Sequence, residues 1–364
     1  MRYEEDEDGI RVIEEYNASL SRKVTFIVLM TVAIVIVICL SGSAGGRHID
    51  VMSIPGIIWD HIMGATYQWG TQEWWDDYVL VQVRMPRILI SCVAGATLAI
   101  CGAAVQSLMS NPIASPYTMG ISSGAGFGAT LAIILGFSLG NVTGMYGITF
   151  NSFVFGMIPV VVILMISRVV RMTPVTLILI GVAISQFFGS LTSLIYIGAE
   201  EGGITAAYLW EIGSIVNVKW ADLPFMAAML VIGGTLLYLA SWKFNVIAMG
   251  EDSAKTMGVD ANKFRLITMC LLALMTMSVV SFVGIIGFVG LIAPHVVRSV
   301  IGSDNRFVMP ASLVGGALLL LCADSVARLG TSDLLPVGTV ISLIGAPVFI
   351  YLILRRNSQF KGAW

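Results

Sequence analysis

The sequence predicts an all-α membrane protein with about ten transmembrane helices per subunit, and three observations support this fold class. Hydrophobic residues make up 57% of the chain. Charged residues make up only 12%, against roughly 25% in soluble domains. The apolar residues also gather in blocks of about 20, the helix length that crosses a hydrocarbon layer of about 30 Å. A helix of a soluble protein would instead carry a polar stripe. The mean hydropathy of +0.89 likewise indicates a membrane protein.

Ten apolar segments can be drawn along the chain. Proline opens three of them, at the helix position where its missing N–H costs least. A further stretch, 204–216, is too broken to span a membrane alone. The ten segments are 24–42, 86–108, 115–137, 146–167, 174–197, 223–242, 266–288, 291–301, 308–328 and 336–354.

An acidic run from Glu4 to Asp8 precedes the first apolar segment. A secretory signal would instead begin with a short basic stretch. We therefore expect residues 1–23 to form an acidic cytoplasmic tail and residues 24–364 to form a single transmembrane domain. Cleavage near Ser43 or Ala44 is the alternative.

The basic residues predict how the chain is oriented. With the N-terminus inside, five of the 20 basic residues fall outside, and the other 15 lie in cytoplasmic loops or ends. This bias follows the positive-inside rule. It predicts an even number of helices and two cytoplasmic termini. The five outside residues are Arg47, Arg84, Arg87, Lys219 and Arg328.

Three of these outside residues, Arg84, Arg87 and Arg328, lie directly at the ends of apolar segments. One interpretation is that they extend to lipid head groups. The other is that they present positive charge to an acidic partner outside the membrane. Asp324 precedes Arg328 by one helical turn, a spacing at which the two side chains can pair.

The loop at residues 248–262 is polar and differs from its surroundings. Gly250 and Gly258 are expected to flank a short helix within it. The loop also invites a nucleotide-binding interpretation, but it fails the pattern G-x-x-x-x-G-K-[ST]. The spacing is one residue short, and Ala254 stands where the second glycine belongs. We therefore expect no ATPase site, no catalytic residue and no cofactor in this chain.

Composition weighs against several other functions. A net charge of −2 gives no general attraction to nucleic acid. The five cysteines lie inside apolar blocks and the three histidines are scattered, so neither a disulfide framework nor a metal site is expected. Ionisable residues are nearly absent from the apolar segments, which argues against a secondary transporter driven by protons or sodium. A membrane enzyme would need a paired base and nucleophile inside the bilayer, and none is evident.

Small residues recur at helical spacing. In lipid, helices associate through close backbone approach, which such residues permit. A purely structural membrane anchor would not need so many glycines on helix faces. The positions are Gly95 and Ala99, Gly120 and Gly124, Gly181, Ser185 and Gly189, and Gly284, Gly287 and Gly290.

Five motifs in order carry a family resemblance. They are RMPR (84–87), GATLAICGAAVQSLMSNPIASPYTMGISSGAG (95–126), GIIGFVGLIAPHVVR (284–298), ADSVARL (323–329) and LPVGTVISLIGAPVFIYLI (335–353). The set resembles the FecCD-type permeases of binding-protein-dependent ABC importers. The resemblance runs from about residue 24 to the C-terminus, and only the acidic tail lies outside it.

The resemblance implies ten helices per subunit and a homodimer with the transport path on its two-fold axis, in the cytoplasmic (inner) membrane. Two copies of a separate ATPase would bind inside, and a substrate-binding protein would dock outside. The implied cargo is an iron–siderophore-type chelate. Cobalamin, haem or an oxyanion such as molybdate are the alternatives.

The resemblance also implies site residues. The docking arginines are Arg84, Arg87 and Arg328; the positions that couple to the ATPase are Gly250, Glu251, Ala254 and Gly258; and the inner gate involves Asn111, Ile113, Thr173 and Thr176. Two departures stand out. Leu334 occupies a place where the family often has Glu, with Asp333 one position earlier. The turn at 173–176 is less hydroxyl-rich than in some relatives.

Overall fold

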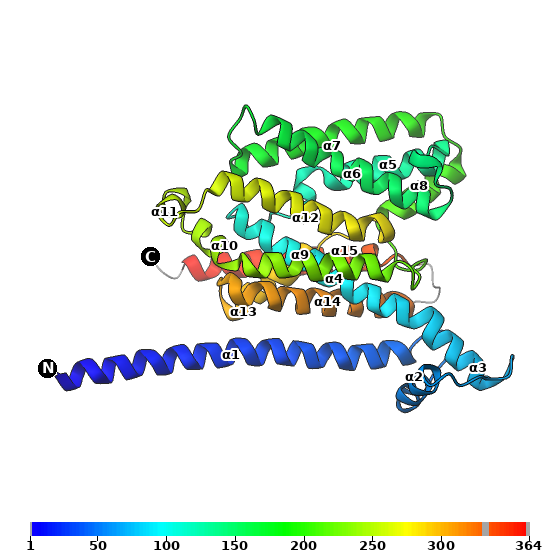
Figure 1. Cartoon of the computed structure of the whole chain (residues 1–364), viewed down its shortest axis with the longest axis horizontal. Helices are drawn as coiled ribbons and strands as arrows, with labels where there is room; N and C mark the ends of the chain where they lie inside the picture. Colours follow the sequence, from blue (N-terminus) through cyan, green and yellow to red (C-terminus); the bar gives the residue numbers. More distant parts are fainter. Residues whose placement is uncertain (1, 330–334, 362–364) are drawn as a thin grey trace.

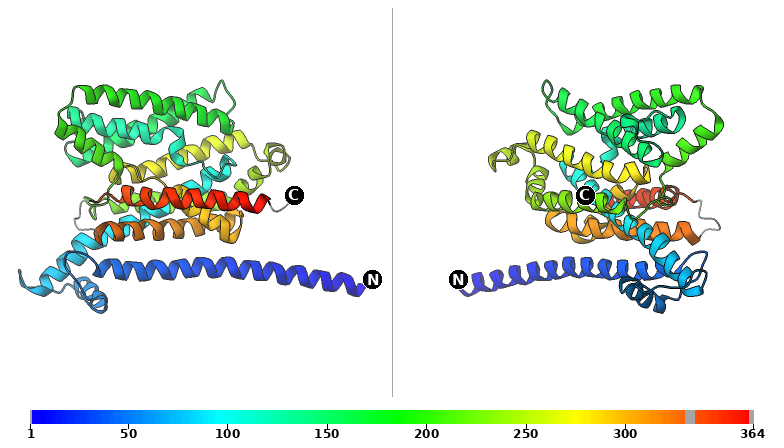
Figure 2. Two further views of the ribbon diagram at one scale, coloured as in Figure 1. Left: turned by 180° about the vertical axis from the view of Figure 1, so that it is seen from behind. Right: turned by 45° about the vertical axis from the view of Figure 1, so that its right-hand side comes forward.

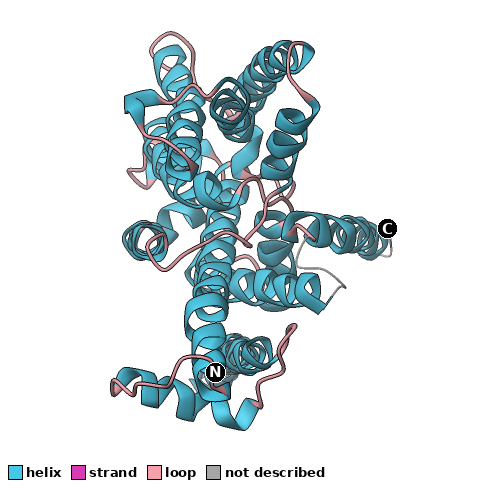
Figure 3. Ribbon diagram, turned by 90° about the vertical axis from the view of Figure 1, so that its right-hand side faces the viewer, coloured by secondary structure: helices cyan, strands magenta, loops and turns pink. Residues whose placement is uncertain are grey.

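The computed structural model describes residues 2–329 and 335–361, and all regular structure in these ranges is helical (Figure 3). The helices run roughly along one long axis (Figure 1). Helix α1 begins and helix α15 ends at the same end of the bundle as the short helix α11 (Glu251–Thr256), whereas α2 (Ile54–Ile62) and α3 (Gln72–Asp77) lie at the opposite end. The all-α prediction is confirmed.

The remaining elements follow in chain order. The helices are α1 (Arg2–Ser43), α4 (Met85–Leu108), α5 (Ile121–Leu135), α6 (Met145–Ile166), α7 (Pro174–Ile197), α8 (Glu201–Ile212), α9 (Leu223–Leu239), α10 (Ser241–Ala248), α12 (Ala261–Val283), α13 (Val289–Ile301), α14 (Asn305–Leu329) and α15 (Val337–Lys361). Short 3-10 or π elements are η1 (Val51–Ser53), η2 (Tyr78–Arg84), η3 (Pro116–Met119) and η4 (Leu139–Asn141).

Six helical stretches of the described chain are long and apolar enough to cross a membrane, or seven if α9 and α10 count as one span bent by 51°. Three shorter apolar helices accompany them: α5, α13 and the part of α15 from Val337 to Tyr351. The chain is therefore a multi-pass membrane protein, and ten full spans stay a prediction.

Two expected spans are shorter in the structure than in the sequence analysis. The segment expected at 115–137 begins as η3, and α5 starts only after Gly120, whose φ is +79°. The segment expected at 266–288 ends with α12 at Val283, because Gly284 (φ +75°) turns the chain out of the helix. Positive φ is cheap for glycine, so each glycine allows a sharp helix end inside an apolar block.

Helix α1 is longer than expected. It runs unbroken over 42 residues, or about 63 Å at 1.5 Å per residue. The residues expected as a tail therefore continue the first helix from Arg2. Over its apolar part it packs mainly along α14 and otherwise stands apart from the bundle (Figures 1 and 2). The Lys23 ammonium lies 4.8 Å from the centre of the Phe307 ring near the start of α14.

Helix α4 is the buried centre of the fold and packs against α9, α12, α13 and α14. A Cβ at Gly95 would lie 2.2 Å from the Gly316 carbonyl oxygen, and one at Gly102 would lie 1.8 Å from that of Gly290. The predicted close approach of helices is confirmed here, whereas Gly189 and Gly287 face open space. Helices α5 to α8 form a second group, which α12 joins to the first (Figure 1).

Candidate functional site

The end of the bundle where α2 and α3 lie, which the positive-inside rule predicts to be the outer end, holds an arginine cluster around one carboxylate. Asp324 of α14 is fully buried. Arg87 of α4 donates from Nε to its Oδ1 at 2.8 Å, and Arg328 Nε lies 3.2 Å from its Oδ2. Arg328 also donates to the Ser41 carbonyl oxygen at 3.1 Å, which ties α14 to α1. The expected pairing of Asp324 with Arg328 is confirmed, while the contact from Arg87 was not predicted.

Arg84 lies beside this cluster in η2 and is 5% exposed. Its guanidinium donates to the Ser43 carbonyl oxygen at 3.0 Å and also to those of Gly42 and Arg47. All three expected docking arginines are thus bonded inside the subunit, and Arg87 is only 9% exposed. Their role in docking stays a prediction, and docking on these groups would require some of these bonds to open.

At the opposite end, predicted to be the inner (cytoplasmic) one, the short helix expected in the loop 248–262 is present as α11. Gly250 (φ +111°) precedes it and Gly258 (φ +77°) follows it, so the prediction of two flanking glycines is confirmed. Ala254 is fully buried, and its carbonyl accepts the Val259 N–H at 2.8 Å. Ala254 therefore anchors the helix with a small apolar side chain, while Asp252 and Lys255 are exposed.

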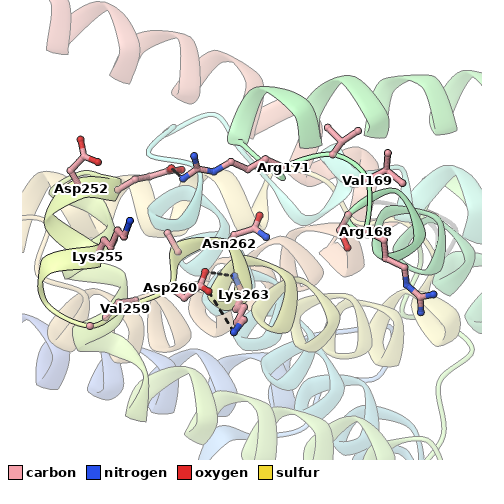
Figure 4. A pocket seen from close by; sticks show the side chains of 14 residues that line it. Arg168, Val169, Arg171, Asp252, Lys255, Val259, Asp260, Asn262 and Lys263 are labelled. Carbon is pink, nitrogen blue, oxygen red and sulfur yellow. Dashed lines mark hydrogen bonds and ion pairs between the residues drawn. The ribbon is translucent and has the colours of Figure 1, made fainter.

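A groove of about 790 Å³ lies between α11, the start of α12 and the turn that joins α6 to α7 (Figure 4). Charged groups of both signs line it, with Arg171 and Asn262 near its centre. The groove is therefore a polar concavity on the protein surface. Its charged residues are Arg168, Arg171, Glu251, Asp252, Lys255, Asp260 and Lys263.

Glu251, the first residue of α11, joins two arginines from different segments. Its Oε1 accepts from Arg265 Nη1 at 2.6 Å, and its Oε2 accepts from Arg171 Nη2 at 2.8 Å. The hydrogen bond from Arg265 lowers the pKa of Glu251; burial opposes this, and the charges of Arg265 and Arg171 add to it. The carboxylate is therefore ionised at neutral pH. Neither arginine was predicted as a partner, although Arg265 stands at the edge of an apolar segment, where an unpaired charge is costly.

The four expected gate residues lie on two segments. Asn111 Oδ1 accepts the Ile113 N–H at 3.0 Å in the loop after α4, and the Ile113 side chain is exposed. Thr173 caps α7 by accepting the Thr176 N–H at 3.2 Å. Element η3 follows the first segment and packs on α7. The gating role stays a prediction, and Asp333 and Leu334 lie outside the described residues.

Comparison with known proteins identifies the family. The FecCD transport family matches residues 33–355. The haemin transport system permease protein HmuU of Yersinia pestis is 32% identical over 286 residues, covering 78% of this chain and 86% of its own. The cobalamin import system permease protein BtuC of Halobacterium salinarum is 34% identical over 294 residues, covering 80% of this chain and 78% of its own.

A solved structure agrees with these relatives. An ABC transporter described as of metal-chelate type, in an inward-facing conformation, superposes with a TM-score of 0.79 at 29% identity. The match covers 91% of this chain and 99% of that chain. The resemblance seen in the motifs therefore holds over nearly the whole polypeptide, and the chain belongs to the FecCD transport family.

Proposed function

We propose that this chain is the permease subunit of a binding-protein-dependent ABC importer in the cytoplasmic membrane. Two copies of the chain form the path on their two-fold axis, two copies of a separate ATPase supply the energy from inside, and a binding protein delivers the cargo from outside. The cargo is an iron–siderophore-type chelate.

The observation that carries this proposal is the inner end of the bundle. An exposed six-residue helix borders a polar groove of about 790 Å³ and is ion-paired to the body of the protein. A separate ATPase that binds at such a helix can displace it, and the ion pair transmits this displacement to the body of the protein. The family membership supports the same interpretation, since relatives are named as permease proteins of a haemin transport system and a cobalamin import system.

Helix α7 supports the homodimer. It is apolar enough to span the membrane, yet most of its surface is exposed in a single subunit. Three of its exposed residues, Gln186, Ser190 and Ser193, are polar, and lipid is a poor environment for such groups. A second copy and a water-filled path would cover this face more favourably.

The outer arginines remain the proposed docking site. We expect acidic residues of the binding protein to replace part of the internal bonding of Arg84 and Arg87. Changing either to Gln should weaken docking, measured as affinity of the binding protein for the permease in nanodiscs, with thermal unfolding recorded in parallel. Lys219→Gln is the charge-matched control, because Lys219 is an exposed outer residue outside the cluster. Unchanged affinity in folded Arg84 and Arg87 variants would remove the docking role.

Proteoliposomes test the proposed function. The chain is reconstituted with its cognate ATPase and binding protein, and ATP-driven uptake of a ferric siderophore is measured. Omitting the ATPase, or using a variant ATPase that cannot hydrolyse ATP, should abolish uptake.

Each contrary result has its own meaning. Uptake by the chain alone would make it a secondary transporter and overturn the proposal. Uptake of only cobalamin, haem or molybdate would show that the proposed cargo is wrong and that the importer function is right. If the assembled complex hydrolyses ATP in response to the binding protein but moves none of these compounds, the assigned cargo class is wrong.

A further inference from the structure

Arg265 is a buried charge at the inner end of α12, and its side chain is 4% exposed. A buried guanidinium is costly unless its donors are satisfied. Within the described chain its partners come from three separate segments. Nη1 donates to Glu251 Oε1 at 2.6 Å and to the Met172 carbonyl oxygen at 3.4 Å, and Nε donates to the Leu108 carbonyl oxygen at 3.4 Å. One rigid group thus touches three parts of the inner surface.

The first partner belongs to the exposed helix α11. The Glu251 side chain is 33% exposed and begins this helix. Any displacement of α11 by a partner in the adjoining groove therefore moves the carboxylate that holds Arg265. The bond is short and joins two full charges, which makes it the strongest of the three contacts.

The second partner precedes α7. Met172 accepts from Arg265 through its carbonyl, and its N–H donates to Asn262 Oδ1 at 3.1 Å. The peptide units on both sides of Met172 are thus held by side chains of α12. The next residue, Thr173, caps α7, so a shift of this turn moves the inner end of that helix.

The third partner is the end of α4. Leu108 is the last residue of this helix, and the final carbonyls of a helix lack partners within the helix and carry partial negative charge. Arg265 satisfies one of them. The loop that holds Asn111 and Ile113 follows directly. The same guanidinium therefore contacts the chain immediately before both segments expected to form the inner gate.

We propose that Arg265 is the positioning residue that transmits movement of α11, through Glu251, to the inner ends of α4 and α7. The inference rests on the proposed importer function and assigns residues to its coupling step. A guanidinium suits the role because its planar fork offers several donors in fixed directions. Lysine keeps the charge but has one ammonium on a flexible stem, so Arg265→Lys separates geometry from charge.

The test compares uptake with ATP hydrolysis in the reconstituted complex. Arg265→Lys, which does not line the groove, should still assemble with the ATPase and show binding-protein-stimulated hydrolysis, whereas Glu251→Gln is scored only by its uptake per ATP hydrolysed. Uptake per ATP should fall by about tenfold, within the range usual for coupling between sites. A purely structural role would lower uptake and hydrolysis together.

Asp304→Asn is the matched control. Asp304 is also a carboxylate at the inner end and bonds to Asn245 at 2.8 Å and Arg306 at 2.7 Å, but it is not bonded to Met172 or Leu108. We expect the complex with Asp304→Asn to take up as much cargo per ATP hydrolysed as the wild type.

The double variant Glu251→Gln/Arg265→Lys tests whether the two residues act through one another. Coupling should fall no further than in the worse single variant, as expected for non-additive neighbours. Wild-type uptake per ATP in Arg265→Lys and Glu251→Gln, or an additive loss in the double variant, would overturn the inference. Failure of the wild-type complex to transport at all would instead count against the proposed function.

Discussion

The two ends of the bundle each carry an arginine network, but the networks differ in exposure. At the outer end, Asp324 is fully buried and its two arginine partners are nearly so. At the inner end, Glu251 is one-third exposed and joins the exposed Arg171 to the buried Arg265. The outer network therefore holds α1, α4 and α14 in one arrangement. The inner network connects a surface helix to backbone deep in the protein.

The difference shows how arginine can have two different roles at the two ends of the bundle. A sealed ion pair stabilises one geometry, because opening it leaves charges without water or partners. A half-exposed pair can exchange partners at lower cost, because water screens the charges. The inner network is thus the better place for a movable connection.

The largest expected effect breaks the outer network. Asp324→Ala leaves Arg87 and Arg328 without their shared carboxylate in a buried site, and removing one partner of a buried pair typically costs about 3–5 kcal/mol. We expect a marked fall in the unfolding midpoint in detergent. Val326→Ala, on an exposed face of the same helix, is the control. Equal midpoints for the two variants would show that the outer network does not stabilise the fold.

A smaller effect is expected from the helix that runs between the two networks. Gly102→Ala places a methyl group against the Gly290 backbone, and such overpacking costs about 1–3 kcal/mol. Gly56→Ala, in α2, meets open space and should leave the unfolding midpoint unchanged or slightly raised, since alanine favours helix. A Gly102 variant as stable as the Gly56 variant would contradict the close packing of α4 on α13.

Acid should weaken the inner network through Glu251. Its pKa is lowered mainly by the hydrogen bond from Arg265, so its ionised form stabilises the folded state. This contribution is complete above the unfolded pKa of about 4.3 and is lost as the pH falls through the lower folded value. Unfolding midpoints measured from about pH 7 downward should therefore fall less in Glu251→Gln than in the wild type below about pH 4.

Asp304 provides the comparison for this titration. Its hydrogen bond from Arg306 is the main cause that lowers its pKa to about 2. Its contribution should persist to a lower pH than that of an ordinary carboxylate. Parallel acid curves for Glu251→Gln and wild type would show that Glu251 does not contribute.

The smallest effect on stability is expected at Arg171, the exposed arginine of the inner network. Arg171 is 71% exposed, and exposed ion pairs typically contribute about 0–1 kcal/mol. Arg171→Gln should therefore shift the unfolding midpoint only slightly, whereas Arg265→Gln, a change at a buried position, should lower it clearly. Similar shifts in the Arg171 and Arg265 variants would mean that the exposure of the arginine does not determine how much it stabilises the fold.

Features with local signals were predictable from the sequence. Helix α7 runs from Pro174 to Ile197 as expected, because Thr173 can cap the helix and proline fits its first turn. The short helix α11 was expected from Gly250 and Gly258, which permit the positive φ at its ends. The apolar blocks likewise predicted most of the longer helices.

Features set by distant contacts were not predictable. The contacts of Arg265 reach 93 and 157 residues along the chain, and nothing at either carbonyl marks it as a partner. The inward direction of Arg84 likewise depends on carbonyls about 40 positions earlier. The break after α12 depends on Gly284 approaching the Trp210 carbonyl. Hydrophobic pattern has no access to such tertiary pairings.

The bond between Arg328 and Ser41 has a consequence for biosynthesis, because its partners are 287 positions apart. Ribosomes add about 5–20 residues per second, so roughly 15–60 s separate the emergence of the two residues. During that interval the first helix has entered the bilayer without its eventual neighbour α14. The apolar span from Asn17 to Ser43 is hardly buried by the rest of the protein, so it can stand in lipid alone until α14 is inserted and the bond to Arg328 forms.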